Sequence, residues 1–259
     1  MKFGFKRIFF LAATAMLAGC ATDRADKTDA SISLEGYEYD CIMELPDSLA
    51  VDVEGGRYVH VTGQGMLPTM IGGEGMESVR DSLMRLGGLS EMDHAGSVPI
   101  VPEGYKLTNI EDKEQAGSTR LNQLTVTLIT PHLVVWRDYS YTYLCRSAHG
   151  MYTTTYVNYS IDKRKILTLE DLFKDNYREP LAQLIRTELR DENISITVPL
   201  EEVEVPSDFE ITETGIRFVY PLYEIAPYVE GEVKVDLASY ELSDLLKEGV
   251  EDMLWHMAD

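Results

Sequence analysis

The sequence has few positive charges for its length. Its 259 residues include 23 Lys and Arg against 44 Asp and Glu, which gives a formal net charge of -21. Nucleic acids and anionic membrane surfaces bind positively charged faces, so this balance argues against both as partners. The acidity favours cationic partners, or it serves solubility alone.

The sequence also lacks the signatures of a metal centre or a nucleophilic active site. It has three cysteines without a CxxC pair and five histidines without an HExxH pattern. A triad could be drawn from Ser147, His149 and Asp138, but no GxSxG turn accompanies the serine. A metal set of His132, His149 and Asp138 lacks paired spacing. We therefore expect a protein that is not an enzyme and that uses no metal or cofactor.

Beyond its N-terminal segment, the sequence has no run of about 18 or more apolar residues, the length that spans a bilayer. At the N-terminus, MKFGFKR places three positive charges before a short apolar run, which is typical of a secretory signal peptide. The following LAGC resembles the lipobox of bacterial lipoproteins. It predicts a signal peptide over residues 1–19, cleavage before Cys20 and attachment of lipid to the Cys20 thiol.

A lipid at the N-terminus would anchor the protein to a membrane of the bacterial cell envelope. Residues 20–33 are small and polar, which predicts a flexible tether. Ala21 stands where an aspartate would mark inner-membrane retention, so we expect the outer membrane, on its periplasmic or surface face. Export also permits disulfides. Cys41 and Cys145 are therefore either a disulfide pair or two separate thiols.

The order of patterns along the chain favours an α+β fold of antiparallel hairpins with packed helices. Strand-like runs flank residues 145–150 and again residues 213–215, and each set predicts a hairpin. Apolar residues at helical spacing predict helices over 76–86 and over 179–190. Residues 90–118 are rich in Gly, Pro and acids, and we expect them to form a long loop.

Four motifs resemble a bacterial envelope domain family when taken in order: SAHG, NYSID, TLEDLF and YPLYEIAPYVEG. This family forms the extracytoplasmic half of the lysozyme-sensing anti-sigma factor RsiV. It also precedes the catalytic domain in some peptidoglycan deacetylases. A lipid-anchored chain cannot carry a signal across the inner membrane, so the resemblance does not imply anti-sigma activity.

The resemblance implies two small modules after the tether. Residues 134–247 are expected to form an RsiV-like C-terminal domain, and residues 34–133 an N-terminal companion α+β module. Residues 248–259 are expected to be a helical tail. Family members carry two glycines before the Ala-His pair, whereas this chain has Arg146 and Ser147 there. That departure means that the family's turn geometry does not transfer directly.

Tyrosines gather on the two strands that flank this turn. Tyr141 and Tyr143 share one face of the first strand, and Tyr152 and Tyr156 share one face of the second. They are either a contact surface for glycans or proteins, or core residues with hydroxyls at the rim. We expect His149 to hydrogen-bond a backbone carbonyl or a nearby tyrosine; ligand contact and general base catalysis are its alternatives.

The combined expectation is a noncatalytic envelope binding protein. The candidate ligands are a cationic host-defence protein such as lysozyme, or peptidoglycan fragments. The alternative is an enzyme, or an accessory module of an enzyme, that acts on peptidoglycan. A structural scaffold among envelope proteins is a third possibility.

Overall fold

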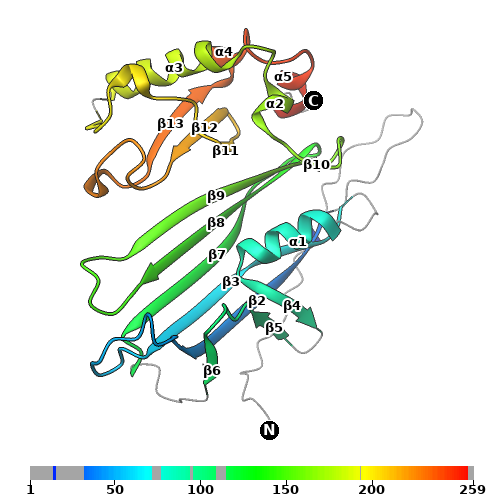
Figure 1. The fold of residues 1–259 in the computed structure, drawn as a ribbon. Helices are drawn as coiled ribbons and strands as arrows, with labels where there is room; N and C mark the ends of the chain where they lie inside the picture. Colours follow the sequence, from blue (N-terminus) through cyan, green and yellow to red (C-terminus); the bar gives the residue numbers. More distant parts are fainter. Residues whose placement is uncertain are drawn as a thin grey trace.

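The structure, a computed structural model, describes residues 14–15, 32–71, 77–93, 96–108, 115–192 and 194–255. Within these residues a long sheet crosses the middle of the molecule (Figure 1). A smaller sheet and most of the helices lie beyond one side of it, at the C-terminal end of the chain.

The large sheet has eight strands among the described residues, and one of its pairs, β3 with β7, is parallel. A parallel pair needs a crossover connection, and the chain between these two strands supplies it. The strand order is β1 (Thr14–Ala15), β2 (Ile32–Glu44), β3 (Tyr58–Ile71), β7 (Ser118–Ile129), β8 (Leu133–Tyr143), β9 (Met151–Ser160) and β10 (Lys165–Ile166), with β6 (Lys106–Thr108) paired to β2.

Two smaller sheets and five helices complete the described part of the fold. The small sheets are β11 (Asp208–Ile211), β12 (Gly215–Tyr220) and β13 (Val233–Ala238), and β4 (Leu89–Asp93) with β5 (Gly96–Pro99). The helices are α1 (Glu77–Leu86), α2 (Leu169–Leu172), α3 (Arg178–Asp191), α4 (Ser239–Leu242) and α5 (Val250–Trp255), and short 3₁₀ turns occupy Leu200–Glu202 and Tyr228–Glu230. The predicted α+β class is confirmed.

Strand β8 is buried on both faces over its first four residues. Leu133, Val134, Val135 and Trp136 all have 0% exposure. Successive strand side chains point to opposite faces. Leu133 and Val135 therefore pack into a core shared with the three-stranded sheet and α3. Val134 and Trp136 pack into a second core, shared with α1, β2 and β3.

A bulge lets strand β7 serve both cores. The β7–β8 register shifts between Val126 and Leu128, so Thr127 is an extra residue. Val126 packs against the core beneath α1, whereas Leu128 packs against the core shared with the three-stranded sheet. Without the bulge, both residues would point to the same face.

Two glycines of β3 make room for tyrosine rings from β2. Gly63 pairs with Tyr39 and Gly65 pairs with Tyr37. A Cβ on Gly63 would overlap the ring of Tyr39. Both rings are almost fully buried. The Tyr39 hydroxyl donates to the carbonyl oxygen of Gly87 at 3.0 Å, which ties β2 to the end of α1.

The predicted hairpins and helices are confirmed, but the loop predicted for residues 90–118 is wrong. Strands β8 and β9 form the first hairpin, and β11 and β12 the second. Helices α1 and α3 occupy the two helical segments. Residues 90–118, however, contain most of β4 and all of β5 and β6. These strands have three to five residues, too few to show alternation in the sequence.

The large sheet is continuous across the predicted module boundary at 133/134. That boundary falls after the first residue of β8, and ten residue pairs join β7 to β8, from Thr119 with Tyr143 to Ile129 with Val134. Helix α5 lies within the predicted tail at 248–259. The division into an N-terminal companion module and a C-terminal domain remains a prediction.

Most of the predicted signal peptide and tether, including Cys20, lies outside the described residues. Among the residues that are described, none of the helices combines the length and apolar character needed to cross a membrane.

Replacement of Gly63 by alanine should destabilise the protein through the ring of Tyr39. We expect Gly63→Ala to lower the free energy of unfolding by about 1–3 kcal/mol, the usual cost of overpacking a filled core. In a Tyr39→Leu background, where the shorter side chain frees the space, the same change should cost much less. Urea unfolding of the four proteins of this cycle measures both costs. Equal costs in the two backgrounds would show that the Tyr39 ring is not the obstacle.

Candidate binding face

Four tyrosines lie on one face of the large sheet near the tip of the β8–β9 hairpin. Tyr141 stands directly opposite Tyr152, and Tyr139 and Tyr143 lie two residues away on either side of Tyr141. The four side chains are half-buried, and the ring centroids of Tyr139 and Tyr152 are 5.9 Å apart. We call these four residues the tyrosine face.

Hydroxyl groups of the tyrosine face are available to a ligand. Across the part of the chain that the structure describes, the hydroxyls of Tyr139, Tyr141 and Tyr143 form no hydrogen bond. The Tyr152 oxygen accepts one from the backbone N–H of Glu232 at 3.3 Å, which leaves its own proton free. Burial, helped by neighbouring tyrosines, raises the pKa of Tyr139 above its ordinary value. That hydroxyl therefore stays protonated at neutral pH and can donate.

Three further aromatic rings meet beside the tyrosine face, and we call them the aromatic corner: His149, Tyr223 and Tyr228. The His149 ring stacks on Tyr228 with 3.9 Å between centroids. The Tyr228 hydroxyl donates to the carbonyl oxygen of Gly150 at 2.8 Å. The corner thus joins the tip of the β8–β9 hairpin to residues 220–231, which are the YPLYEIAPYVEG motif.

His149 uses both ring nitrogens within this corner. Nδ1 lies 3.0 Å from the carbonyl oxygen of Gly150, and a carbonyl only accepts, so Nδ1 carries the hydrogen. In the neutral ring, Nε2 then accepts from the Tyr223 hydroxyl at 3.1 Å. A backbone carbonyl and a nearby tyrosine are the partners that the sequence suggested. In this arrangement Nε2 is the ring nitrogen that keeps a lone pair, and that lone pair is directed at the Tyr223 hydroxyl.

Tyr156 does not belong to the contact surface for which it was a candidate. Its side chain is 8% exposed and packs into the core shared with the three-stranded sheet. Burial raises the pKa of its hydroxyl to about 12. Sequence alternation placed Tyr152 and Tyr156 on one face correctly, but it could not show that the smaller sheet covers only one of them.

The residues of the imagined triad and metal set are not brought together. Asp138 points to the face of β8 opposite the tyrosine face and is 5% exposed, whereas Ser147 and His149 are exposed in the turn. The Nδ1 atom of His132 instead lies 2.8 Å from a carboxylate oxygen of Asp162. Within the described residues, no group of three or more His, Cys, Asp or Glu side chains could hold a metal ion.

The outer edge of β9 is capped by side chains instead of by a full-length neighbouring strand. The two Glu232 carboxylate oxygens accept from the Thr154 backbone N–H and hydroxyl, at 2.6 and 2.7 Å. Asp208 accepts from the Tyr156 N–H at 3.1 Å. The Asn158 amide both donates to and accepts from the backbone of β11. These bonds hold the three-stranded sheet against β9 as a wall beside the tyrosine face.

The two cysteines that could have formed a disulfide are separate thiols. Cys41 lies within β2, and Cys145 lies just beyond β8. Strands β3 and β7 stand between them, so the separation is about three strand spacings, or roughly 14 Å. A disulfide needs Cα atoms within about 7 Å.

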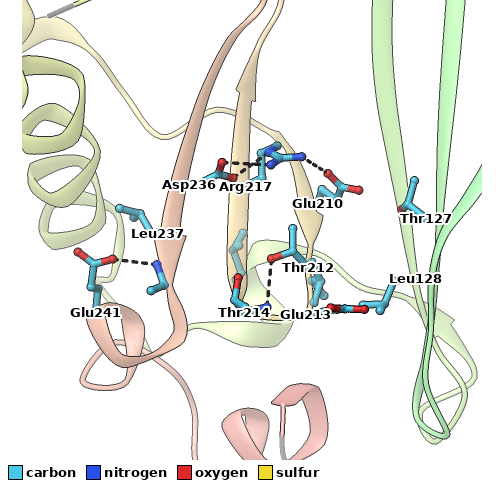
Figure 2. A pocket seen from close by; sticks show the side chains of 13 residues that line it. Thr127, Leu128, Glu210, Thr212, Glu213, Thr214, Arg217, Asp236, Leu237 and Glu241 are labelled. Carbon is cyan, nitrogen blue, oxygen red and sulfur yellow. Dashed lines mark hydrogen bonds and ion pairs between the residues drawn. The ribbon is translucent and has the colours of Figure 1, made fainter. Parts of the chain in front are cut away.

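A pocket of about 480 Å³ lies between the bulge of β7 and the end of the three-stranded sheet (Figure 2). Arg217 extends into it and is fully paired: its Nε and Nη2 donate to Asp236 at 2.8 and 3.1 Å, and Nη1 donates to Glu210 at 3.0 Å. Glu213 and Glu241 add further acids to the lining. The pocket therefore carries more negative than positive charge.

Comparison with known proteins places this architecture in a known class of fold. A crystal structure of a DUF3298 family member from Bacteroides fragilis matches with a TM-score of 0.64 and 17% identity, over 89% of this chain and 100% of that one. A DUF3298 family protein from Pseudomonas aeruginosa matches with a TM-score of 0.57 and 15% identity, over 86% and 98%. At these identities the matches establish the fold alone.

The sequence matches agree with the structural ones. Residues 170–239 match the family model described as Protein of unknown function (DUF3298). The chain is also 28% identical over 154 residues to the peptidoglycan-N-acetylmuramic acid deacetylase PdaC of Bacillus subtilis, which is 53% of this chain and 32% of PdaC. The chain thus spans about a third of that relative. The expected resemblance to this family, and to part of a peptidoglycan deacetylase, is confirmed.

Sequence reasoning missed several residues of the candidate site. Tyr223 and Tyr228 lie in the most specific motif of the resemblance, yet nothing in their spacing indicated that they meet His149. Glu232 is one of 44 acidic residues, and nothing in the sequence distinguishes it as the one that binds the edge of β9. Arg137 precedes Tyr139 by two residues, and alternation alone could have placed it on the tyrosine face.

Asp138 should make stability depend on pH. Burial raises its pKa from 3.8 to about 7, and within the described residues its Oδ1 has no hydrogen-bond partner. The folded protein therefore holds this proton more tightly than the unfolded chain, so stability falls as pH rises from about 4 to about 7. We expect Asp138→Asn to be more stable than the natural protein at pH 8, with little difference at pH 4.

Thermal and urea unfolding at several pH values measure this difference. Asp208 has a pKa raised to about 6 by burial and contributes in the same direction, so some pH dependence should survive in Asp138→Asn. Parallel pH profiles for the two proteins would contradict the role assigned to Asp138.

Proposed function

We propose that this chain is a noncatalytic binding protein of the bacterial cell envelope, and that its tyrosine face binds glycan fragments of peptidoglycan. The observation that carries the proposal is a set of four half-buried tyrosine rings whose hydroxyls have protons free to donate. Tyrosine offers an apolar ring and a polar tip. Sugar rings have C–H surfaces that stack on such rings, and hydroxyl and acetamide groups that accept from them.

Two further observations support this proposal. The aromatic corner extends the face with His149 and Tyr223, both of which are exposed. The relative PdaC is named for an activity on a peptidoglycan sugar, although the chain spans only part of it. A binding role fits the aromatic corner better than triad catalysis does, because Asp138 is buried on the face of β8 opposite the tyrosine face, away from His149.

A cationic protein such as lysozyme is a second candidate ligand. The acidic pocket between β7 and the three-stranded sheet and the net charge of -21 favour such a partner. The proposal also includes attachment to the outer membrane through lipid on Cys20, on which the lipobox-like sequence is the supporting observation.

Loss of the tyrosine rings should weaken glycan binding. We expect Tyr141→Ala and Tyr143→Ala each to raise the dissociation constant for soluble muropeptides about tenfold, the effect of losing roughly 1.4 kcal/mol at a contact hot spot. Isothermal titration with purified muropeptides measures the constants. Tyr240→Ala is the matched control, since Tyr240 is 75% exposed on α4, and it should bind as the natural protein does.

Circular dichroism should show that the variants are folded before their affinities are compared. If the tyrosine variants bind muropeptides as tightly as Tyr240→Ala does, the tyrosine face is not the site. If the natural protein releases a new product from muropeptides, the noncatalytic role is wrong.

The second candidate predicts a saturable complex with lysozyme that weakens as salt is raised, because screening shortens the reach of the charges. Surface plasmon resonance at about 50 and 500 mM salt checks this, with a neutral protein of similar size as the control. An affinity that is the same at both salt concentrations would contradict an attraction based on charge.

A further inference from the structure

Arg137 is a half-buried arginine of β8 whose guanidinium forms no hydrogen bond with any other described residue. Its Nε is buried without a partner, and across the described residues no carboxylate pairs with its guanidinium. Arginine stays charged at any physiological pH, and a buried donor without an acceptor destabilises the folded state. The absence is unexpected in a chain with 44 acidic residues.

The position of Arg137 links it to the tyrosine face. It precedes Tyr139 by two residues on β8, so its side chain lies on the same face of the sheet. Its neighbours across the strands are Thr125 on β7, which is exposed, and Tyr156 on β9. The guanidinium therefore stands between an open part of the sheet and the wall formed by the three-stranded sheet.

The acids that act on Tyr156, the neighbour of Arg137 on β9, have partners of their own. Arg137 and Arg217 lower the pKa of Tyr156 electrostatically, and Glu210 and Asp208 raise it, so all four charges act on the same hydroxyl. Glu210 pairs with Arg217. Asp208 accepts from the backbone N–H of Tyr156 on the β9 edge. Among the described residues, neither carboxylate forms an ion pair with Arg137.

We infer that Arg137 is the subsite for a carboxylate of the ligand bound at the tyrosine face, so that the ligand is an acidic glycan fragment instead of a neutral one. The inference rests on the proposed function. The planar guanidinium matches the two oxygens of a carboxylate and binds them side by side. In peptidoglycan fragments, the carboxylate comes either from the lactyl group of N-acetylmuramic acid or from the attached peptide.

Three probes test the inference by isothermal titration. The first is the peptide-free disaccharide of N-acetylglucosamine and N-acetylmuramic acid, which has a free lactyl carboxylate. The second is the same disaccharide with that carboxyl converted to its neutral amide. The third is the disaccharide carrying a stem peptide, in which the lactyl carboxyl is already an amide and the charges lie on the peptide.

We expect the natural protein to bind at least one carboxylate probe about tenfold or more tightly than the neutral amide. Arg137→Met should abolish that preference, and it should weaken binding of the carboxylate probe far more than binding of the neutral amide. Arg137→Lys keeps the charge but loses the two-pronged geometry, so it should retain only part of the preference. Arg190→Met is the matched control, because Arg190 is exposed in the last turn of α3, and it should behave as the natural protein does.

The outcomes separate this inference from the proposed function. Preference for the first or for the third probe identifies the sugar or the peptide as the source of the carboxylate, and either result supports the inference. Equal binding of all three probes would overturn it while the glycan-binding function stands. If Arg137→Met weakens binding of the neutral amide as much as it weakens binding of the charged probes, Arg137 has a purely structural role. Failure of every probe to bind the natural protein would reject the proposed function itself.

Discussion

Burial of β8 on both faces is the constraint on which the other layers depend. A strand covered on both sides must be apolar at successive positions, and Leu133 to Trp136 meet this requirement with no exposed side chain. A slip of one residue in its register would move each side chain into the opposite core. The bulge at Thr127 fits the same constraint, since it lets the neighbouring strand contribute to both cores.

The location of the tyrosine face follows from where this double burial ends. The core beneath the three-stranded sheet takes only Leu133 and Val135 from β8. From Arg137 onward the side chains of that face are half-buried, because the smaller sheet rests on β9 and is held there by Glu232 and Asp208. One strand thus serves as a core element at one end and as the floor of a candidate site at the other. A rigid floor of this kind preserves the relative positions of its side chains when a ligand binds.

Local sequence patterns predicted much of the secondary structure, whereas the remaining features depend on tertiary contacts. Alternation predicted the β8–β9 hairpin and placed Tyr141 and Tyr143 on one face, because strand geometry alone sets that relation. The helical spacing of apolar residues predicted α1, because helix geometry alone likewise sets which side chains share a face. The parallel pairing of β3 with β7 joins residues about 60 apart, and no local pattern encodes it. The separation of Cys41 from Cys145 follows from that pairing, because β3 and β7 stand between them. The burial of Tyr156 follows instead from the packing of the three-stranded sheet, which no local pattern encodes either.

The acidic composition is used in at least two different ways within the structure. Glu232 and Asp208 accept hydrogen bonds from the backbone of β9, so they act as structural acceptors that replace a strand at an otherwise open edge. Glu210 and Asp236 instead surround Arg217 and leave it without free capacity. Arg137, on the same side of the large sheet, pairs with no carboxylate of the described residues. Because acids outnumber basic residues almost two to one in this chain, an unpaired guanidinium beside ring hydroxyls is better explained by an external acceptor than by a shortage of internal ones.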